Sequence, residues 1–250
     1  HLLSRRQRQM CIRDSAKALI LCNPSNPCGK VFTMEEMQTI AELAKKYDAY
    51  VVTDEVYEHI VYAPNKHIYM QSLEGMRERT IVCNSLSKTY SITGWRLGYV
   101  IANPQIIDRV KKVHDFLTVG AAAPLMEAAV VGLEFGDGYY DELAAHYAHM
   151  KEVFVGGLKK LGLKYTDPQG AYYVLVDVSE FGVKDDVKFC EWMAQFVGVA
   201  AVPGSSFFRE DVHNLVRFHF AKQDDTLNEA IKRLATLKEK AMNAKNVDWR

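Results

Sequence analysis

The sequence predicts an α/β protein in which helices sandwich a mostly parallel sheet, with a smaller C-terminal α+β domain. Two patterns predict this division. Between residues 16 and 102, short apolar runs alternate with helical segments, which is typical of a parallel sheet with helices on its faces. From about residue 140, a long helical segment leads into strands and helices of mixed order. We expect residues 16–139 to form part of the larger domain and residues 140–250 to form the smaller one.

The elements of the larger domain follow from their apolar periodicity. Strands are predicted over residues 17–22, 50–54, 80–83 and 97–102. A helix is predicted over 35–47, because Thr33-Met-Glu-Glu36 has the spacing of a capping box. Two further helices are predicted over 104–117 and 124–134.

The smaller domain is predicted to begin with a helix over 138–160, in which Gly156-Gly157 is a point of weakness. Strands are expected over 172–178, 199–202 and 215–220. Helices are expected over 184–196 and 226–241.

Composition limits the possible functions. The 250 residues are 48% hydrophobic and 25% charged, which suffices for a large core in one or two domains. A net charge of +0 argues against a nucleic-acid or membrane-surface partner. Five scattered cysteines indicate reduced thiols and a cytoplasmic protein. No metal site is expected, since His146 and His149 lack a third ligand.

The stretch from Ser85 to Gly98 carries the strongest chemical signal. It places Ser85, Ser87, Lys88 and Arg96 just after an apolar run. Hydroxyls and a guanidinium suit a phosphate, and a desolvated lysine amine attacks a carbonyl. A ligand that carries both a phosphate and an aldehyde is pyridoxal phosphate. Taken alone, the stretch could equally be a solvated loop.

Two upstream segments strengthen this interpretation. Asn23-Pro-Ser-Asn26-Pro-Cys-Gly29 is stiffer than a plain turn needs, which favours a positioned Asn26 side chain. Asp54 ends the strand predicted over 50–54, and Tyr57 follows three residues later. Ligands of parallel sheets bind outside the carboxyl ends of strands, where a carboxylate can pair with a protonated ring nitrogen. Asp54 could equally cap the next helix.

Together with Val216-Arg217-Phe218, these motifs resemble the fold-type I pyridoxal-phosphate enzymes of the class I/II aminotransferase group, from about Lys17 to about Met242. The resemblance implies a homodimer that binds pyridoxal 5'-phosphate. It also implies transfer of an amino group from an L-amino acid to a 2-oxo acid by a ping-pong Schiff-base mechanism. Residues 54–62 and 88–95 are most similar to the aspartate/tyrosine/aromatic and kynurenine–glutamine transaminase branches.

The resemblance assigns the chemical roles. Lys88 would form the internal Schiff base and then move a proton as general base and acid. Asp54 would hold the pyridine nitrogen protonated. Tyr57 and Asn26 would donate hydrogen bonds to the ring hydroxyl oxygen.

It also assigns the binding roles. Ser85, Ser87 and Arg96 would bind the cofactor phosphate. Arg217, with Asn26 beside the substrate, would clamp the α-carboxylate. Because Arg217 lies in the alternating run 215–220, it could instead point to water from a half-buried strand.

Three other functions remain open. A pyridoxal-phosphate-dependent C–S β-lyase on the same fold would use the same Lys88, Asp54 and Arg217, so product analysis must separate the two enzymes. An aminotransferase-like effector domain of a transcription regulator would need a DNA-binding segment upstream. A non-catalytic relic is disfavoured because those three residues are intact.

The first 15 residues do not fit the family pattern. They contain four arginines and no initiator Met, and we expect them to be a non-native extension. The pattern starts at Lys17 in the middle of the large domain. We therefore expect an N-terminal portion to be missing, with its cofactor-stacking ring and phosphate-binding turn. On this expectation the isolated fragment folds poorly and is inactive.

Overall fold

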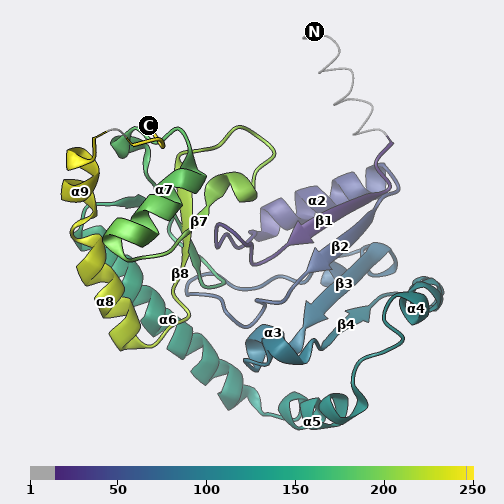
Figure 1. Ribbon diagram of the computed structural model, residues 1–250. Coiled ribbons are helices and arrows are strands. Elements are labelled where there is room, and N and C mark those ends of the chain that lie inside the picture. The colour runs from purple at the N-terminus through teal and green to yellow at the C-terminus, as the bar shows by residue number, and fades with distance from the viewer. Residues whose placement is uncertain (1–14, 246) are drawn as a thin grey trace. The chain divides into compact units, whose positions relative to one another are not determined.

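The computed structural model describes residues 15–245 and 247–250, so the expected N-terminal extension lies outside the described residues apart from Ser15. The chain divides into two units (Figure 1). Of the described residues, unit 1 holds 15–24 together with Val31–Tyr140. Unit 2 holds Ser25–Lys30 and Asp141–Arg250.

Unit 1 is built on a four-stranded sheet of order β1-β2-β3-β4 (Figure 1). Its strands are β1 (Ala18–Cys22), β2 (Tyr50–Asp54), β3 (Thr80–Ser85) and β4 (Gly98–Ile101). The first two pairings are parallel and the third is antiparallel. The connection from β3 to β4 contains only the one-turn helix α3 (Leu86–Thr89) and a 3-10 turn. The predicted α/β class with a mostly parallel sheet is confirmed.

Three helices of unit 1 lie within one residue of their predicted ranges: α2 (Met34–Lys46), α4 (Pro104–Leu117) and α5 (Ala123–Leu133). The four-residue helix α3 (Leu86–Thr89) and the short 3-10 turns at Met70–Ser72, Arg77–Arg79 and Thr93–Trp95 were not predicted. The predicted capping box is present: Thr33 Oγ1 accepts the Glu36 N–H, and Glu36 accepts the Thr33 N–H. Helix α2 buries Met37 and Ala41 in a core shared with Val51 of β2.

Unit 2 contains an antiparallel sheet of order β5-β6-β8-β7. The strands are β5 (Lys164–Tyr165), β6 (Tyr173–Asp177), β7 (Val202–Pro203) and β8 (Leu215–His219). Around them lie α6 (Asp137–Lys160), whose first turn belongs to unit 1, α7 (Asp186–Trp192), α8 (Asp224–Leu234) and α9 (Leu237–Asn243).

Unit 2 departs from the predicted elements in four places. The strand predicted over 199–202 is displaced to β7, Val202–Pro203, and residues 199–201 lie outside any strand. Strand β5 has only two residues, too few to produce a sequence signal. The helix predicted to reach 196 changes after Trp192 into a π-helical turn, Met193–Val197. The helix predicted over 226–241 breaks after Leu234, where the Thr236 hydroxyl donates to the Arg233 carbonyl and competes with the helical backbone bonds.

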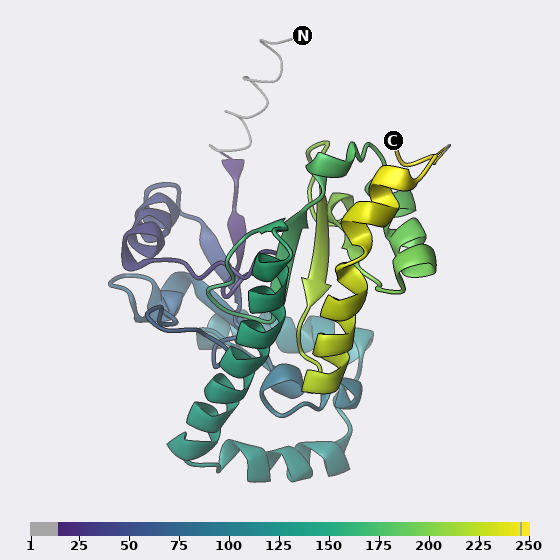
Figure 2. The ribbon, with the colours of Figure 1, turned by 90° about the vertical axis from the view of Figure 1, so that its left-hand side faces the viewer.

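The paired glycines of α6 do not interrupt it. The helix runs unbroken past Gly156 and Gly157. A Cβ at Gly157 would lie 2.5 Å from Ile231 of α8, whereas one at Gly156 would meet no atom within 4 Å. Gly157 therefore lets α6 and α8 lie side by side (Figures 1 and 2).

Two findings bear on the cellular setting. Within the part of the chain that the structure describes, no helix is both long and apolar enough to cross a bilayer. The four described cysteines, Cys22, Cys28, Cys83 and Cys190, are free thiols.

Candidate active site

The turn from β3 into α3 brings two predicted hydroxyls together. Ser85 is the N-cap of α3, and its Oγ accepts the Ser87 N–H at 3.1 Å. The two Oγ atoms lie 2.6 Å apart, and Ser85 Oγ also donates to the Leu97 carbonyl at 3.0 Å. The hydroxyls are thus fixed at the carboxyl end of β3, where parallel sheets bind ligands.

Lys88 and Arg96 are linked through Thr93. Lys88 Nζ lies 3.5 Å from Thr93 Oγ1, and that hydroxyl donates to the Ser87 carbonyl at 3.3 Å. One Arg96 guanidinium nitrogen donates to the Thr93 carbonyl at 2.9 Å. Arg96 has a φ of +57°, a left-handed conformation that costs a non-glycine residue roughly 1–2 kcal/mol. Such strain clusters at functional sites.

Tyrosines hold the end of α3 that follows Lys88. The Tyr139 hydroxyl donates to the Thr89 carbonyl at 2.6 Å, and the Tyr90 and Tyr140 hydroxyls lie 2.9 Å apart. The Tyr90 and Tyr139 rings stack at 5.7 Å. Burial, and then the Tyr140 hydroxyl, raise the pKa of Tyr90.

Asp54 ends β2 in register with Cys22 of β1 and Cys83 of β3. Its carboxylate is exposed and accepts the Val56 N–H at 3.3 Å, inside a turn and not at the start of an α-helix. Burial, and then the charge of Asp54, raise the pKa of the Cys83 thiol. Tyr57, three residues after Asp54, is buried.

Arg96 opens onto a cavity of about 710 Å³ in unit 1. Cys83, Asn84 and Tyr99 also line it, while Lys88 and Asp54 do not. Burial, and then the charge of Glu58, raise the pKa of the Tyr99 phenol to about 12.

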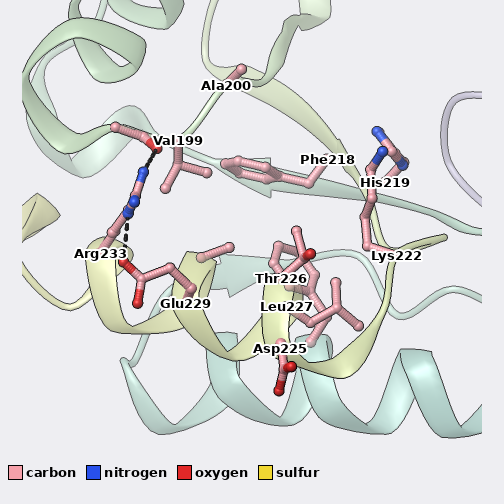
Figure 3. A pocket seen from close by; sticks show the side chains of 13 residues that line it. Val199, Ala200, Phe218, His219, Lys222, Asp225, Thr226, Leu227, Glu229 and Arg233 are labelled. Carbon is pink, nitrogen blue, oxygen red and sulfur yellow. Dashed lines mark hydrogen bonds and ion pairs between the residues drawn. The ribbon is translucent and has the colours of Figure 1, made fainter.

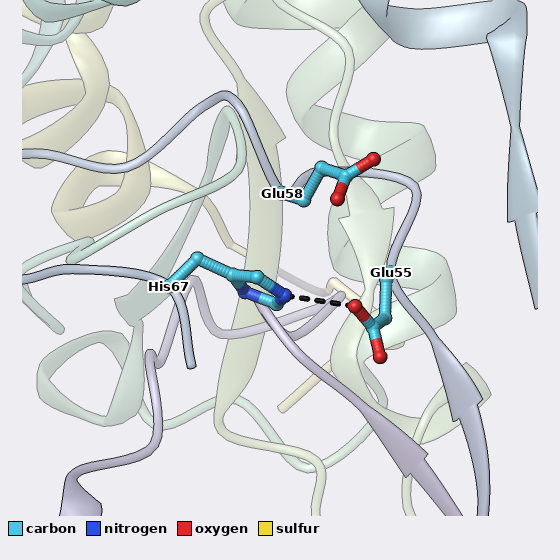
Figure 4. A group of neighbouring side chains, drawn as sticks. All are labelled: Glu55, Glu58 and His67. Carbon is cyan, nitrogen blue, oxygen red and sulfur yellow. Dashed lines mark hydrogen bonds and ion pairs between the residues drawn. The ribbon is translucent and has the colours of Figure 1, made fainter. Parts of the chain in front are cut away.

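A cluster of Glu55, Glu58 and His67 lies beside these residues in the sequence and has metal-ligand chemistry (Figure 4). Both carboxylates and His67 Nε2 are engaged by protein, whereas the buried His67 Nδ1 has no hydrogen-bond partner among the described residues. Glu55 accepts the Thr53 hydroxyl at 2.7 Å and lies 2.9 Å from His67 Nε2. Glu58 accepts the Asn84 amide at 2.5 Å. These hydrogen bonds account for the cluster without an ion.

The segment Ser25–Lys30, which carries Asn26, belongs to unit 2 and is joined to it through Gly29. The Gly29 carbonyl accepts the backbone N–H groups of Gln169 and Gly170, each at 2.8 Å. Gly29 has a φ of +68°, and a Cβ there would lie 2.9 Å from the Gly170 carbonyl oxygen. Only glycine allows this close approach without strain.

Arg217 of β8 lies between two aromatic rings. Its guanidinium carbon is 4.3 Å from the Tyr173 ring centroid and 4.4 Å from the Phe207 ring centroid. One terminal nitrogen donates to Asn26 Oδ1 at 2.6 Å. The buried Nε has no hydrogen-bond partner among the described residues. Arg217 is therefore held in a slot, and its free donor favours an anionic ligand.

A second cavity, of about 550 Å³, lies in unit 2 beside α8 and Phe218 (Figure 3). Its Arg233 is satisfied internally, since it bonds Glu229 and the Gly198 carbonyl (Figure 3). None of the predicted site residues lines it.

Comparison with known proteins places the chain in a family. The family model described as aminotransferase class I and II matches residues 5–234, and the match begins ahead of Lys17. This chain belongs to the class I and II aminotransferases.

Individual members of that family align over most of this chain. A probable N-succinyldiaminopimelate aminotransferase of Mycobacterium tuberculosis is 36% identical, covering 92% of this chain and 60% of that protein. Kynurenine–oxoglutarate transaminase 3 of Bos taurus is 37% identical, covering 87% and 52%. The crystal structure of an aromatic aminotransferase from Pyrococcus horikoshii superposes with a TM-score of 0.85 at 32% identity, covering 95% and 64%. The chain thus spans about half to two thirds of these aminotransferases.

Three contacts at the aminotransferase motifs escaped the sequence analysis: those of Thr93, Tyr173 and Phe207. The alternation of β6 could have revealed Tyr173, since it shares a face with Leu175, the register partner of Arg217. Phe207 lies in an irregular loop, where no pattern marks it. The predicted residues fall into two groups, with Asn26 and Arg217 in unit 2 and the others in unit 1.

Proposed function

We propose that the protein containing this chain transfers an amino group from an L-amino acid to a 2-oxo acid with pyridoxal 5'-phosphate as cofactor. The observation that carries the proposal is the β3–α3 turn. There one amine, two hydroxyls and one guanidinium are tied together by hydrogen bonds.

The residues present fit this cofactor. Ser85, Ser87 and Arg96 offer hydroxyl and guanidinium donors for a phosphate. Lys88 offers the amine for an aldehyde, and the exposed carboxylate of Asp54 suits a protonated ring nitrogen. When bound, the cofactor supplies an electron sink for the bond that breaks at the substrate α-carbon.

The protein's own groups then bind, orient and move the proton. Arg217 binds the substrate carboxylate with its remaining donors. Asn26 Oδ1 is taken by Arg217, which leaves the Asn26 amide N–H groups, with Tyr57, to donate to the ring hydroxyl oxygen. Lys88 Nζ, which lies 3.5 Å from the Thr93 hydroxyl, would take the proton from the α-carbon of the amino donor. In the second half-reaction it would deliver a proton to the α-carbon of the 2-oxo acid as that acid becomes an amino acid.

The resemblance implies an aromatic, methionine-like or acidic amino donor with 2-oxoglutarate as acceptor, and of these we propose the aromatic donor. Two relatives support it: the kynurenine–oxoglutarate transaminase of Bos taurus and the aromatic aminotransferase of Pyrococcus horikoshii. We further propose a cytoplasmic homodimer. The free thiols support the compartment, and the exposed Phe116 and Leu117 of α4 support an interface with a second copy.

Borohydride reduction of the cofactor-loaded protein tests the function. A covalent adduct found by peptide mass spectrometry on Lys88, and lost in Lys88→Ala, is the expected result. Adducts spread over many lysines would contradict it. Product analysis with kynurenine and 2-oxoglutarate then separates the enzymes: glutamate indicates a transaminase, whereas ammonia and a thiol from a cysteine conjugate indicate the β-lyase alternative.

A further inference from the structure

The loop that carries Phe207 is tied down at its start. After β7 it passes so close to β8 that a Cβ on Gly204 would lie 2.5 Å from the Leu215 carbonyl oxygen. The next turn is Gly204–Ser206, and the Phe207 N–H closes it by donating to the Gly204 carbonyl at 2.9 Å. The Phe207 ring then forms one wall of the Arg217 slot.

Both ends of this loop converge on Asp186, at the first turn of α7. Asp186 is fully buried, yet its carboxylate is well satisfied. Oδ2 accepts the Ser205 N–H at 2.7 Å, and Oδ1 lies 2.9 Å from His213 Nδ1. His213 Nε2 lies 2.7 Å from Asp211 Oδ1. Because both imidazole nitrogens face carboxylates, His213 is placed as a protonated donor to each.

A buried carboxylate is costly unless it is paired and hydrogen-bonded. Losing either the Ser205 N–H or the His213 contact would leave the Asp186 carboxylate under-satisfied, so both contacts resist opening of the loop. Ser205 precedes Phe207 by two residues and His213 follows it by six. One carboxylate therefore restrains the loop on both sides of the ring that covers Arg217.

We propose that Asp186 and His213 are positioning residues, which clamp loop 204–213 so that Phe207 holds the Arg217 guanidinium in its carboxylate-binding orientation. Only the last clause rests on the proposed function. The clamp is a property of unit 2 and can be measured without substrate.

Labelling with phenylglyoxal, an arginine reagent, tests the clamp on the protein without added substrate. The modification rate of the Arg217 peptide is normalised to the other arginine peptides of the same digest. His213→Ala should raise this rate about tenfold, because a hydrogen bond to a charged group is strong enough to shift a local opening equilibrium by that factor. Phe207→Ala should raise it at least as much.

His213→Gln should lie between the wild type and His213→Ala, because its amide can still donate to Asp186. The matched control is His149→Gln, since His149 pairs with Asp224 at 2.8 Å and joins α6 to α8 instead of holding the loop. It should leave the Arg217 rate unchanged.

Three results would overturn the proposal: an unchanged rate in His213→Ala, an unchanged rate in Phe207→Ala, or an equal rise at every arginine peptide. Since His213 is only half-buried, its variants remain informative even where Asp186→Asn prevents folding. Labelling needs no cofactor chemistry, so a negative result here leaves the transaminase proposal standing. Likewise, failure of the borohydride test leaves the clamp standing.

Discussion

The β3–α3 turn of unit 1 and the Arg217 slot of unit 2 are assembled in opposite ways. The turn takes its hydroxyls, amine and guanidinium from a stretch that spans Ser85 to Arg96, and local hydrogen bonds fix them. The slot joins Arg217 to Asn26, 191 residues away in the chain, and to rings from β6 and an irregular loop. The turn is therefore set by local sequence and the slot by tertiary packing.

This difference determines how each region should respond to mutation. In the turn, changing one group removes one chemical function while its neighbours keep their backbone bonds. In the slot, substituting an aromatic ring or a residue that anchors the loop should change the position of the Arg217 guanidinium, although Arg217 itself is unchanged. Substitutions in the turn should therefore remove one chemical group, whereas substitutions in the slot should disturb the packing around Arg217.

The largest expected effect is that of Lys88→Ala. Removing the proposed proton-transfer amine should lower kcat by about 10³-fold or more, as the loss of a group that forms covalent bonds and moves protons does. Initial rates of glutamate formation measure it. Lys159→Ala, at an exposed position in the last turn of α6, is the control and should retain wild-type rates. A Lys88→Ala protein with near-normal kcat would remove the turn from the mechanism.

Arg217→Lys should raise KM for the amino donor and the 2-oxo acid about 10–100-fold with a smaller change in kcat. Lysine cannot supply a planar fork, and it stacks less well between the Tyr173 and Phe207 rings. Arg233→Lys, in the same unit but paired with Glu229, is the matched control. Equal effects of the two substitutions would mean that the slot has no special role.

Thr93→Val tests the link inside the turn. Valine keeps the shape but removes the hydroxyl that lies near Lys88 Nζ and bonds the Ser87 carbonyl. We expect kcat to fall about tenfold while KM for the carboxylate substrates stays unchanged, because a neutral hydrogen bond contributes about 1 kcal/mol. A change confined to KM would indicate that Thr93 acts on substrate binding instead.

Gly157→Ala should destabilise the protein by about 1–3 kcal/mol, because the new methyl group would overlap Ile231. Gly156→Ala is an unusually close control, one residue away on the same helix with open space around it. It should stabilise by about 0.5–1 kcal/mol through helix propensity. Urea denaturation monitored by circular dichroism measures both. Similar midpoints for the two variants would contradict the close packing of α6 against α8.

The same contrast explains what the sequence could predict. The capping box at Thr33 and the strand ending at Asp54 are local patterns, and the structure has both as predicted. The transfer of Ser25–Lys30 to unit 2 has no local signal, because it depends on Gly29 meeting Gln169 and Gly170 across the fold.

Residues that act by packing were not found in this way. Asp186 reads as an ordinary first-turn acid of a helix, and its burial becomes evident only once loop 204–213 folds back over it. From the sequence, Gly157 is only a point of weakness in its helix, because helix propensity takes no account of the neighbouring helix. A sequence pattern describes one helix, strand or loop at a time, whereas the roles of Asp186 and Gly157 each depend on contact between two such elements.

The smallest expected effect is a pH dependence of stability in unit 2. Hydrogen bonds to Asp186 and then to Asp211, the charged groups that face His213, raise its pKa above the ordinary value. A raised folded-state pKa means that the pair contributes stability fully below the unfolded pKa of about 6.5. That contribution is lost as the pH rises through the folded pKa. The urea midpoint of the wild type should therefore fall more between pH 6 and pH 8, on the order of a few tenths molar, than that of His213→Gln. Parallel midpoints across this range would mean that His213 holds the loop through hydrogen bonds that do not depend on its charge.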